Sequence, residues 1–139
     1  IKAFLDFPLE LYKNCEYFVP PLYGDEKKMF SKNFVYNDTC ESVFFLAESD
    51  GKTVGRISGI IQKASNEKNN EKRVRFTRFD AIDDVNVSSA LFSAVGSWAK
   101  NKGMTKICGP LGYSDLEREG LLIYGFNELS TFEENYNYD

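Results

Sequence analysis

The residue types that this chain lacks limit its chemistry before any fold is considered. Its 139 residues include no histidine, so Ser-His-Asp and Cys-His nucleophilic systems lose their usual base. General acid-base chemistry therefore falls to aspartate, glutamate, tyrosine or cysteine. The three cysteines, Cys15, Cys40 and Cys108, are an odd number and form no CxxC pair, which predicts reduced cytoplasmic thiols. The absence of histidine also argues against a zinc site.

Composition and charge narrow the possible partners. The net charge is -4 and the pI is about 5.0, which argues against nucleic acid as the main partner because phosphate binding needs a positive field. Arg73, Arg75 and Arg78 are a local exception; on a strand the first two share a face and the third lies on the other, so we expect a solvated strand edge. The longest apolar runs, such as residues 43–47, fall far short of the ~20 residues that cross a bilayer. We therefore expect a soluble, cytoplasmic domain without a membrane or nucleic-acid partner.

The clearest structural signals predict a strand over residues 73–83, a helix over residues 85–102 and a strand over residues 105–111. The helix carries one apolar stripe, at steps of three and four residues, formed by Val87, Leu91, Ala94, Val95 and Trp98. Asp84 is the expected N-cap and Gly103 the expected left-handed C-cap. A strand, a helix and a strand in close succession predict a right-handed crossover between parallel neighbouring strands.

The segment before this unit predicts short helices. Phe4, Phe7 and Leu11 share one face of a helix in which Pro8 cannot donate to the preceding turn, so we expect a kink, or two short helices that meet at Pro8. A further short helix is predicted over residues 25–30, where acidic residues occupy the favourable first turn.

A hairpin is predicted between residues 43–47 and residues 52–61, because an Asp-Gly dipeptide separates two strand-like runs. In the second run, Gly55 and Gly59 fall on one face and leave part of it flat, so they either mark bulges or let another segment approach closely. The polar residues 62–72 predict an exposed loop.

Beyond residue 111 the signals are weaker. Ser114 or Asp115 could cap a short helix, and the apolar residues 121–124 are expected to be buried. The tail, residues 127–139, predicts a weak strand followed by a disordered end. Both ends look cropped, so we expect the chain to be the N-terminal part of a longer protein.

The order of helix, helix, hairpin, strand, long amphipathic helix and strand is similar to that of the GNAT superfamily of N-acetyltransferases. The segment ALFSAVGSWAKNKGMTKICGPL (residues 90–111) looks like that superfamily's central helix, glycine stop and following strand. The segment FFLAESDGKTVGRISGII (residues 44–61) resembles its second and third strands. More narrowly, YFVPPL (residues 17–22) and GPLGYSDLEREGLLIYGF (residues 109–126) resemble an uncharacterised bacterial group of longer GNAT-like proteins.

The resemblance implies an α+β fold, with a GNAT-like mixed, mostly antiparallel sheet, a central parallel strand-helix-strand unit and flanking helices. It covers residues 1–126, with a first strand expected before Ile1. In the superfamily, acetyl-CoA or another acyl-CoA enters between two splayed strands, and its pyrophosphate meets the amides at the start of the helix. The residues implied to bind it here are Phe79, Ala81, Ile82, Val85, Asn86 and Val87.

This chain departs from the superfamily at the pyrophosphate loop. The loop has the form Q/R-x-x-G-x-G/A, whereas residues 80–86 read DAIDDVN and contain no glycine to let amides curl around a phosphate. Asp83 and Asp84 place two carboxylates where the pyrophosphate would lie, at a cost on the order of 1 kcal/mol or more each. The resemblance therefore implies an atypical coenzyme site.

Within the resemblance, Asp80 is the expected general base, and Tyr124 is the expected acid. The alternatives are a strand-end aspartate bound to a local amide and a core tyrosine with its hydroxyl at the edge. Two functions remain open. One is an N-acyltransferase that acts on a small-molecule amine or an amino group. The other is a non-catalytic GNAT-like binding or structural module of a larger protein, with a possible second domain.

Overall fold

The computed structural model of the chain describes residues 1–131 and 134–139. It has an α+β fold, in which helices flank a four-stranded, mostly antiparallel sheet. The elements, in chain order, are α1 (Lys2–Leu11), α2 (Tyr23–Lys28), β1 (Cys40–Ser49), β2 (Lys52–Gln62), α3 (Lys63–Asn69), β3 (Arg73–Ala81), α4 (Val85–Asn101) and β4 (Lys106–Cys108). The tail predicted as a weak strand includes Phe132 and Glu133, which lie outside the described residues; the described part of the tail forms no strand.

The sheet has the strand order β1-β2-β3-β4. β1 and β2 form the predicted antiparallel hairpin, and its turn places Asp50 and Gly51 at positive φ angles of 51° and 74°. β3 runs antiparallel to β2, and β4 runs parallel to β3, which confirms the parallel strand-helix-strand unit. β4 is shorter than predicted, because Pro110 has no backbone N–H to continue the ladder.

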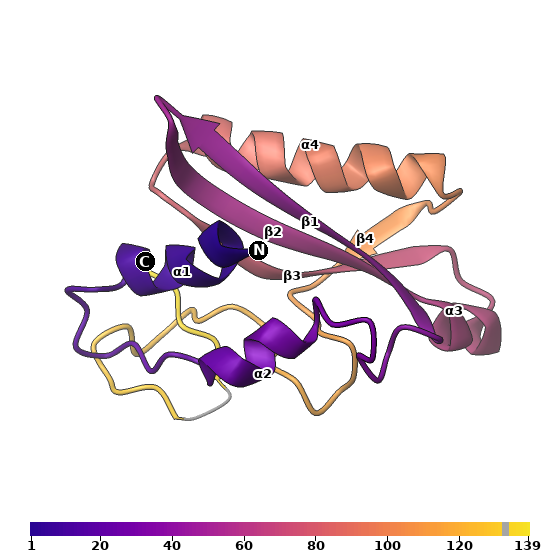
Figure 1. Cartoon of the computed structure of the whole chain (residues 1–139), viewed down its shortest axis with the longest axis horizontal. Helices are drawn as coiled ribbons and strands as arrows, with labels where there is room; N and C mark the ends of the chain where they lie inside the picture. Colours follow the sequence, from indigo (N-terminus) through magenta and orange to yellow (C-terminus); the bar gives the residue numbers. More distant parts are fainter. Residues whose placement is uncertain (132–133) are drawn as a thin grey trace.

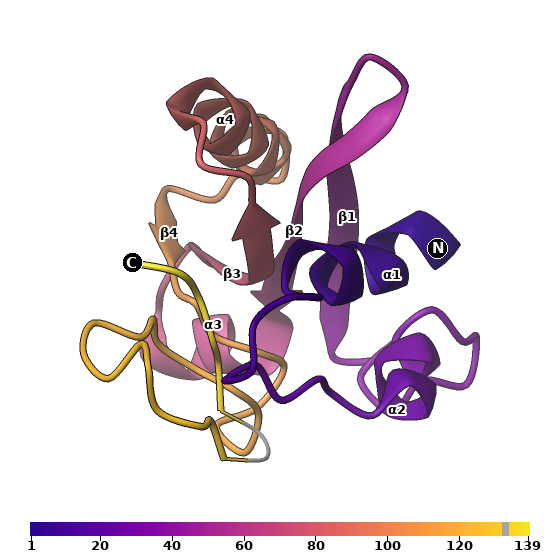
Figure 2. The same ribbon diagram turned by 90° about the vertical axis from the view of Figure 1, so that its left-hand side faces the viewer.

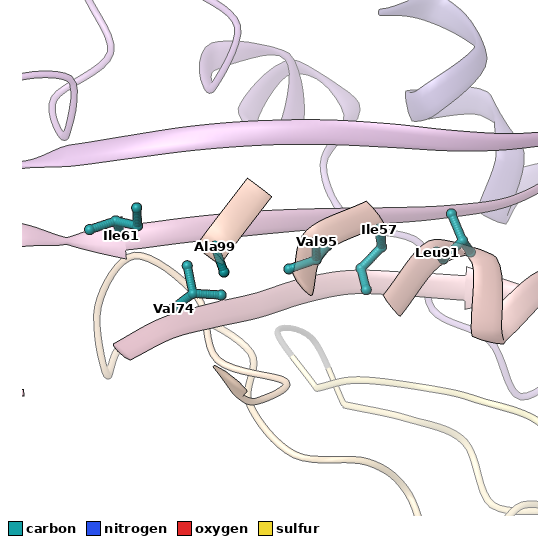
Figure 3. Close-up of a cluster of buried hydrophobic side chains, with 6 residues drawn as sticks. All are labelled: Ile57, Ile61, Val74, Leu91, Val95 and Ala99. Atoms are coloured by element: carbon teal, nitrogen blue, oxygen red, sulfur yellow. The ribbon is translucent and has the colours of Figure 1, made fainter. Parts of the chain in front are cut away.

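α4 covers one face of the sheet, and α1, α2 and the loops after β4 lie on the other (Figures 1 and 2). Between α4 and the sheet lies an apolar core, shown in Figure 3, formed by Ile57, Ile61, Val74, Leu91, Val95 and Ala99. Gly55 and Gly59 let α4 approach this closely. A Cβ atom at Gly55 would lie 2.8 Å from Leu91 Cδ1, and one at Gly59 would lie 3.2 Å from Trp98 Cζ3.

The ends of α4 follow the sequence prediction. The Asp84 carboxylate accepts a hydrogen bond from the Asn86 N–H at 2.8 Å, and Gly103 follows the helix with a φ of 75°. Among the described residues, none of the helices combines the length and the apolar composition of a bilayer span.

Two predictions for the first part of the chain need correction. Of the two alternatives at Pro8, a meeting of two short helices is wrong, because Pro8 lies inside α1, which is one helix. Residues 62–72 are not a loop, since they contain α3. Gln62 caps this helix by accepting from the Ser65 N–H at 2.6 Å, and Asn70 ends it in the left-handed conformation.

Two predictions for the region after β4 are also wrong. The residues around Ser114 form a turn instead of a short helix, in which the Leu116 N–H donates to the Ser114 hydroxyl at 3.3 Å. The run predicted to be buried is largely exposed, with Ile123 at 88% and Tyr124 at 84% of their accessible surface. A four-residue apolar run is too short to distinguish a core strand from an exposed loop.

Candidate functional site

A buried carboxylate lies on the sheet face that α1 covers. Asp80 in β3 pairs across the strands with Arg56 in β2, and the Arg56 Nε–H donates to Asp80 Oδ2 at 2.8 Å. The Tyr12 hydroxyl donates to Asp80 Oδ1 at 2.9 Å. Asp80 is 8% exposed and Arg56 is 5% exposed, so each charge depends on the other for its solvation.

A bulge in β3 aims Asp80 at this face. Arg56 lies opposite Asp80, and Ser58 lies opposite Thr77, so two steps along β2 match three along β3. The extra residue lies at Arg78, which has a positive φ of 50°. Strict alternation would place Phe79 on this face, whereas Phe79 instead packs against Phe92 of α4. The bulge therefore delivers the carboxylate to the α1 side.

The same bulge corrects the prediction for the arginines. Arg78 is not a solvated residue on the opposite face, because its guanidinium binds Glu26 of α2 at 2.9 Å and Glu117 at 3.4 Å. Burial alone would raise the pKa of Glu26, but the charge and hydrogen bonds of Arg78 lower it overall. Arg75 is also buried, and its Nη1 donates to the Gly112 carbonyl oxygen at 3.1 Å.

Tyr12 is the residue of this site that sequence reasoning missed. It follows α1 directly and is 4% exposed. Burial, and then the negative charge of Asp80, raise the pKa of the Tyr12 phenol, so the phenol remains a proton donor to the carboxylate. It lies four residues after Pro8 and seven after Leu5, a helical spacing that places it on the buried face of α1, and this was the available signal.

Two hollows flank Asp80. The inner hollow lies between α1, α2 and the residues after β4, encloses about 60 Å³, and is lined in part by Glu26, Arg56, Thr77, Arg78, Asp80 and Glu117. The outer hollow, of about 690 Å³, lies beside the start of α4 and is lined in part by Tyr12, Phe79, Asp80, Ala81, Ile82 and Val85. Figure 2 shows the end of the chain beside β3, and Tyr138 and Asp139 also line the outer hollow. Asp80 is thus reached from two sides.

β3 extends beyond its parallel neighbour. β4 pairs with β3 from Arg73 to Arg75, and one more backbone hydrogen bond joins the Leu111 N–H to the Phe76 carbonyl oxygen at 2.8 Å. β3 continues to Ala81, and no strand in residues 1–131 or 134–139 pairs with this last part on the β4 side. The second half of β3 therefore has a free edge that borders both hollows.

The start of α4 supplies only part of the predicted coenzyme site. Four of the implied residues, Phe79, Ala81, Ile82 and Val85, line the outer hollow. Asn86 does not line it, and its N–H is already bound to the Asp84 carboxylate. Val87 packs against the core under α4. Asp83 and Asp84 also line this hollow, so two acidic side chains stand at its α4 end.

The structure does not bring Tyr124 to Asp80. Tyr124 is 84% exposed and lines a different hollow, together with Cys15 and Tyr136. The phenol beside Asp80 belongs instead to Tyr12.

Comparison with known proteins identifies longer relatives. The chain is 35% identical over 127 residues to Protein YghO of Escherichia coli strain K12. The matched region covers 91% of this chain and 33% of that protein. It is 32% identical over 130 residues to the bacterial ceramide synthase of Caulobacter vibrioides. The matched region covers 91% of this chain and 34% of that protein. No protein-family model and no solved structure matches the chain. The chain therefore spans about a third of the length of these curated relatives.

Proposed function

We propose that the chain is a GNAT-like N-acyltransferase domain that transfers an acyl group from acyl-CoA to an amine. The observation that carries the proposal is the free edge of β3 beside Asp80, a buried carboxylate that borders a hollow on each side. A free strand edge offers backbone N–H and C=O groups to an extended ligand. The amide-containing arm of an acyl-CoA is such a ligand.

In the proposed reaction, the outer hollow holds the thioester and the inner hollow holds the amine. The amine nitrogen attacks the thioester carbonyl carbon, a C–N bond forms and the C–S bond breaks. Asp80 accepts the proton that the nitrogen loses, and CoA leaves as the thiolate. Each carboxylate oxygen of Asp80 has two lone pairs and accepts one protein hydrogen bond, so each can accept another. Tyr12 and Arg56 act as positioning residues, because they hold the carboxylate without contacting the reacting atoms.

The α4 end of the outer hollow does not fit a pyrophosphate well. The Asp84 side chain occupies the Asn86 N–H that an anion would use, and Asp83 adds a second negative charge. The proposal therefore places the affinity for the donor in the acyl and pantetheine parts, and it expects a weak contribution from the pyrophosphate.

The name of one relative supports the reaction class. A ceramide is an amide whose nitrogen carries a fatty acyl group, and formation of such an amide is an N-acyl transfer. The relatives are about three times as long as this chain, so we propose that a second domain completes the protein. Because acyl-CoA is an intracellular donor, the proposal also places the domain in the cytoplasm.

The second candidate is a non-catalytic GNAT-like module that serves as a binding or structural part of a larger protein. It is favoured by the two carboxylates at the start of α4, which oppose the binding of an anionic coenzyme.

The melting temperature of the purified full-length protein separates the two candidates. It is measured as acetyl-CoA, or a long-chain acyl-CoA, is added. An acyltransferase is stabilised as the donor concentration exceeds the dissociation constant, whereas no shift at millimolar acetyl-CoA or with the long-chain donor supports the module. Asp80→Asn tests the base in the same protein. If this variant still binds acyl-CoA but no longer transfers the acyl group, Asp80 is supported as the base. If transfer is undiminished, Asp80 is not the base.

A further inference from the structure

The outer hollow is acidic where a coenzyme would place its phosphates. The described residues that line it include Asp80, Asp83, Asp84 and Asp139, and none of them is a lysine or an arginine. Arg56 pairs with Asp80, whereas Asp83 and Asp84 are exposed carboxylates at the start of α4. This end of the hollow therefore repels anions.

The backbone amides at the start of α4 are already used. The Asn86 N–H donates to the Asp84 carboxylate at 2.8 Å, and the N–H groups of Val87 and Ser88 donate to the Asp84 carbonyl oxygen at 3.0 and 3.2 Å. A helix binds a phosphate through N–H groups that its own chain leaves free. Because these amides have partners within the chain, the helix offers little to the phosphates of a nucleotide.

The same hollow suits the other end of an acyl donor. The free edge of β3 offers backbone N–H and C=O groups to the amide groups of a pantetheine arm. Ile82, Val85, Leu121 and Tyr138 line the hollow, and each side chain exposes between 40% and 74% of its surface. Exposed apolar groups that gather around a hollow are typical of a surface that contacts another molecule.

Acyl donors that share this arm differ in what the arm is attached to. In coenzyme A it ends in a nucleotide with a diphosphate and a further phosphate, whereas in a carrier protein it ends in a phosphodiester on a serine. The carrier-bound arm brings fewer negative charges to Asp83 and Asp84, so it meets less repulsion. Repulsion of one ligand is a means of specificity for another.

We propose that the outer hollow binds the acylated pantetheine arm and leaves out the nucleotide, so that an arm attached to a carrier protein is preferred to CoA as the donor. The inference rests on the proposed N-acyl transfer for the identity of the ligand, and it adds how the acyl group is presented. Asp83 is then a specificity-determining residue. The amine nitrogen forms the C–N bond, its proton passes to Asp80, and the pantetheine thiolate leaves on the carrier.

The first test uses two probes that share the thioester and the arm, S-acetylpantetheine and acetyl-CoA. Their dissociation constants for the full-length protein are measured by ligand-observed NMR at low salt, without an amine. The wild type is expected to bind S-acetylpantetheine about 5-fold more tightly. Asp83→Asn is expected to remove most of this preference by strengthening the binding of acetyl-CoA alone. The exposed Asp38→Asn is the control and leaves the preference unchanged.

The second test uses the carrier itself. An acyl carrier protein with an acetylated phosphopantetheine arm is expected to bind the full-length protein, and the same carrier without its arm is expected to lose this binding. A loaded carrier that binds no better than the carrier without its arm overturns the inference.

The inference is also overturned if the wild type binds acetyl-CoA as tightly as S-acetylpantetheine, or more tightly, because the nucleotide is then held. These measurements contain no amine, so that result leaves transfer from acetyl-CoA open. If neither probe binds, the proposed function fails and the inference fails with it. A preference for S-acetylpantetheine in a protein that transfers no acyl group removes the proposed function alone.

Discussion

The side chain of Arg56 donates a hydrogen bond from Nη1 to the carbonyl oxygen of Phe4, at 2.8 Å. In an uninterrupted helix this oxygen would accept from the backbone N–H of the residue four positions later, but that residue is Pro8, which has none. Arg56 thus supplies the donor that α1 lacks, while its Nε holds Asp80 at 2.8 Å. One guanidinium joins the helix to the sheet and fixes the site between them.

Replacement of Arg56 is expected to be severe. Arg56→Met leaves the Asp80 charge buried without a counterion and the Phe4 carbonyl without a donor, so we expect a loss of about 3–5 kcal/mol in the free energy of unfolding. Urea unfolding measures this loss. Arg73→Ala is the matched control, because Arg73 pairs with Glu71 at 3.3 Å while both remain partly exposed, and such pairs contribute about 0–1 kcal/mol. Similar losses in the two variants would contradict the role of Arg56.

The ion pair between Glu26 and Arg78 is expected to make stability depend on pH. Arg78 lowers the pKa of Glu26 below its ordinary value of 4.5, so the pair stabilises the fold fully above about pH 4.5. The contribution is lost as the pH falls through the lower, folded-state pKa. Glu26→Gln is therefore expected to cost about 1–3 kcal/mol at pH 7 and progressively less below pH 4.5. Unfolding of both proteins from pH 7 to pH 3 measures the difference, and the exposed Glu119→Gln should show none of it.

The space around two glycines, Gly55 in β2 and Gly24 in α2, predicts opposite effects when each is replaced by alanine. Gly55→Ala would place its Cβ 2.8 Å from Leu91 Cδ1 and 2.9 Å from Val87 Cγ1, so we expect a loss of about 1–3 kcal/mol. Gly24 lies inside α2 with nothing within 4 Å of such a Cβ, so Gly24→Ala is expected to stabilise by about 0.5–1 kcal/mol. Thermal unfolding compares the two. A neutral Gly55→Ala would mean that α4 can move away from the sheet.

Local sequence signals predict much of the scaffold. The apolar stripe and caps of α4 and the Asp-Gly turn of the hairpin involve residues close in sequence, so they can be recognised without the fold. The site is different, because Tyr12, Arg56 and Asp80 come from three separate elements. A two-residue period along β3 cannot show that the bulge at Arg78 turns Asp80 toward α1.

The acidic start of α4 predicts a measurable effect on donor binding. Asp83 lines the outer hollow, whereas Asp84 caps the helix and is best left intact. Asp83→Asn removes one repulsion of roughly 1 kcal/mol, so we expect acetyl-CoA to bind about 5-fold more tightly at low salt. The gain should shrink at high salt, where the charge is screened. Isothermal titration calorimetry at two ionic strengths tests this, with the exposed Asp38→Asn as the control. An unchanged affinity would place the pyrophosphate away from α4.

Two tyrosines can be compared for their part in the proposed transfer. The Tyr12 hydroxyl holds Asp80 at 2.9 Å, whereas the Tyr124 side chain is exposed and lines another hollow. Tyr12→Phe leaves Asp80 with one donor fewer and free to reorient, so we expect kcat to fall by about 10-fold or more while the KM for acyl-CoA stays the same. Tyr124→Phe should change neither constant. Steady-state kinetics of both variants measure kcat and KM separately. Urea unfolding measures the stability lost with the hydrogen bond, which we expect to be about 1–3 kcal/mol. If kcat falls in Tyr124→Phe and not in Tyr12→Phe, Tyr124 is the phenol that takes part in the transfer. The loop after β4 would then have to close over Asp80.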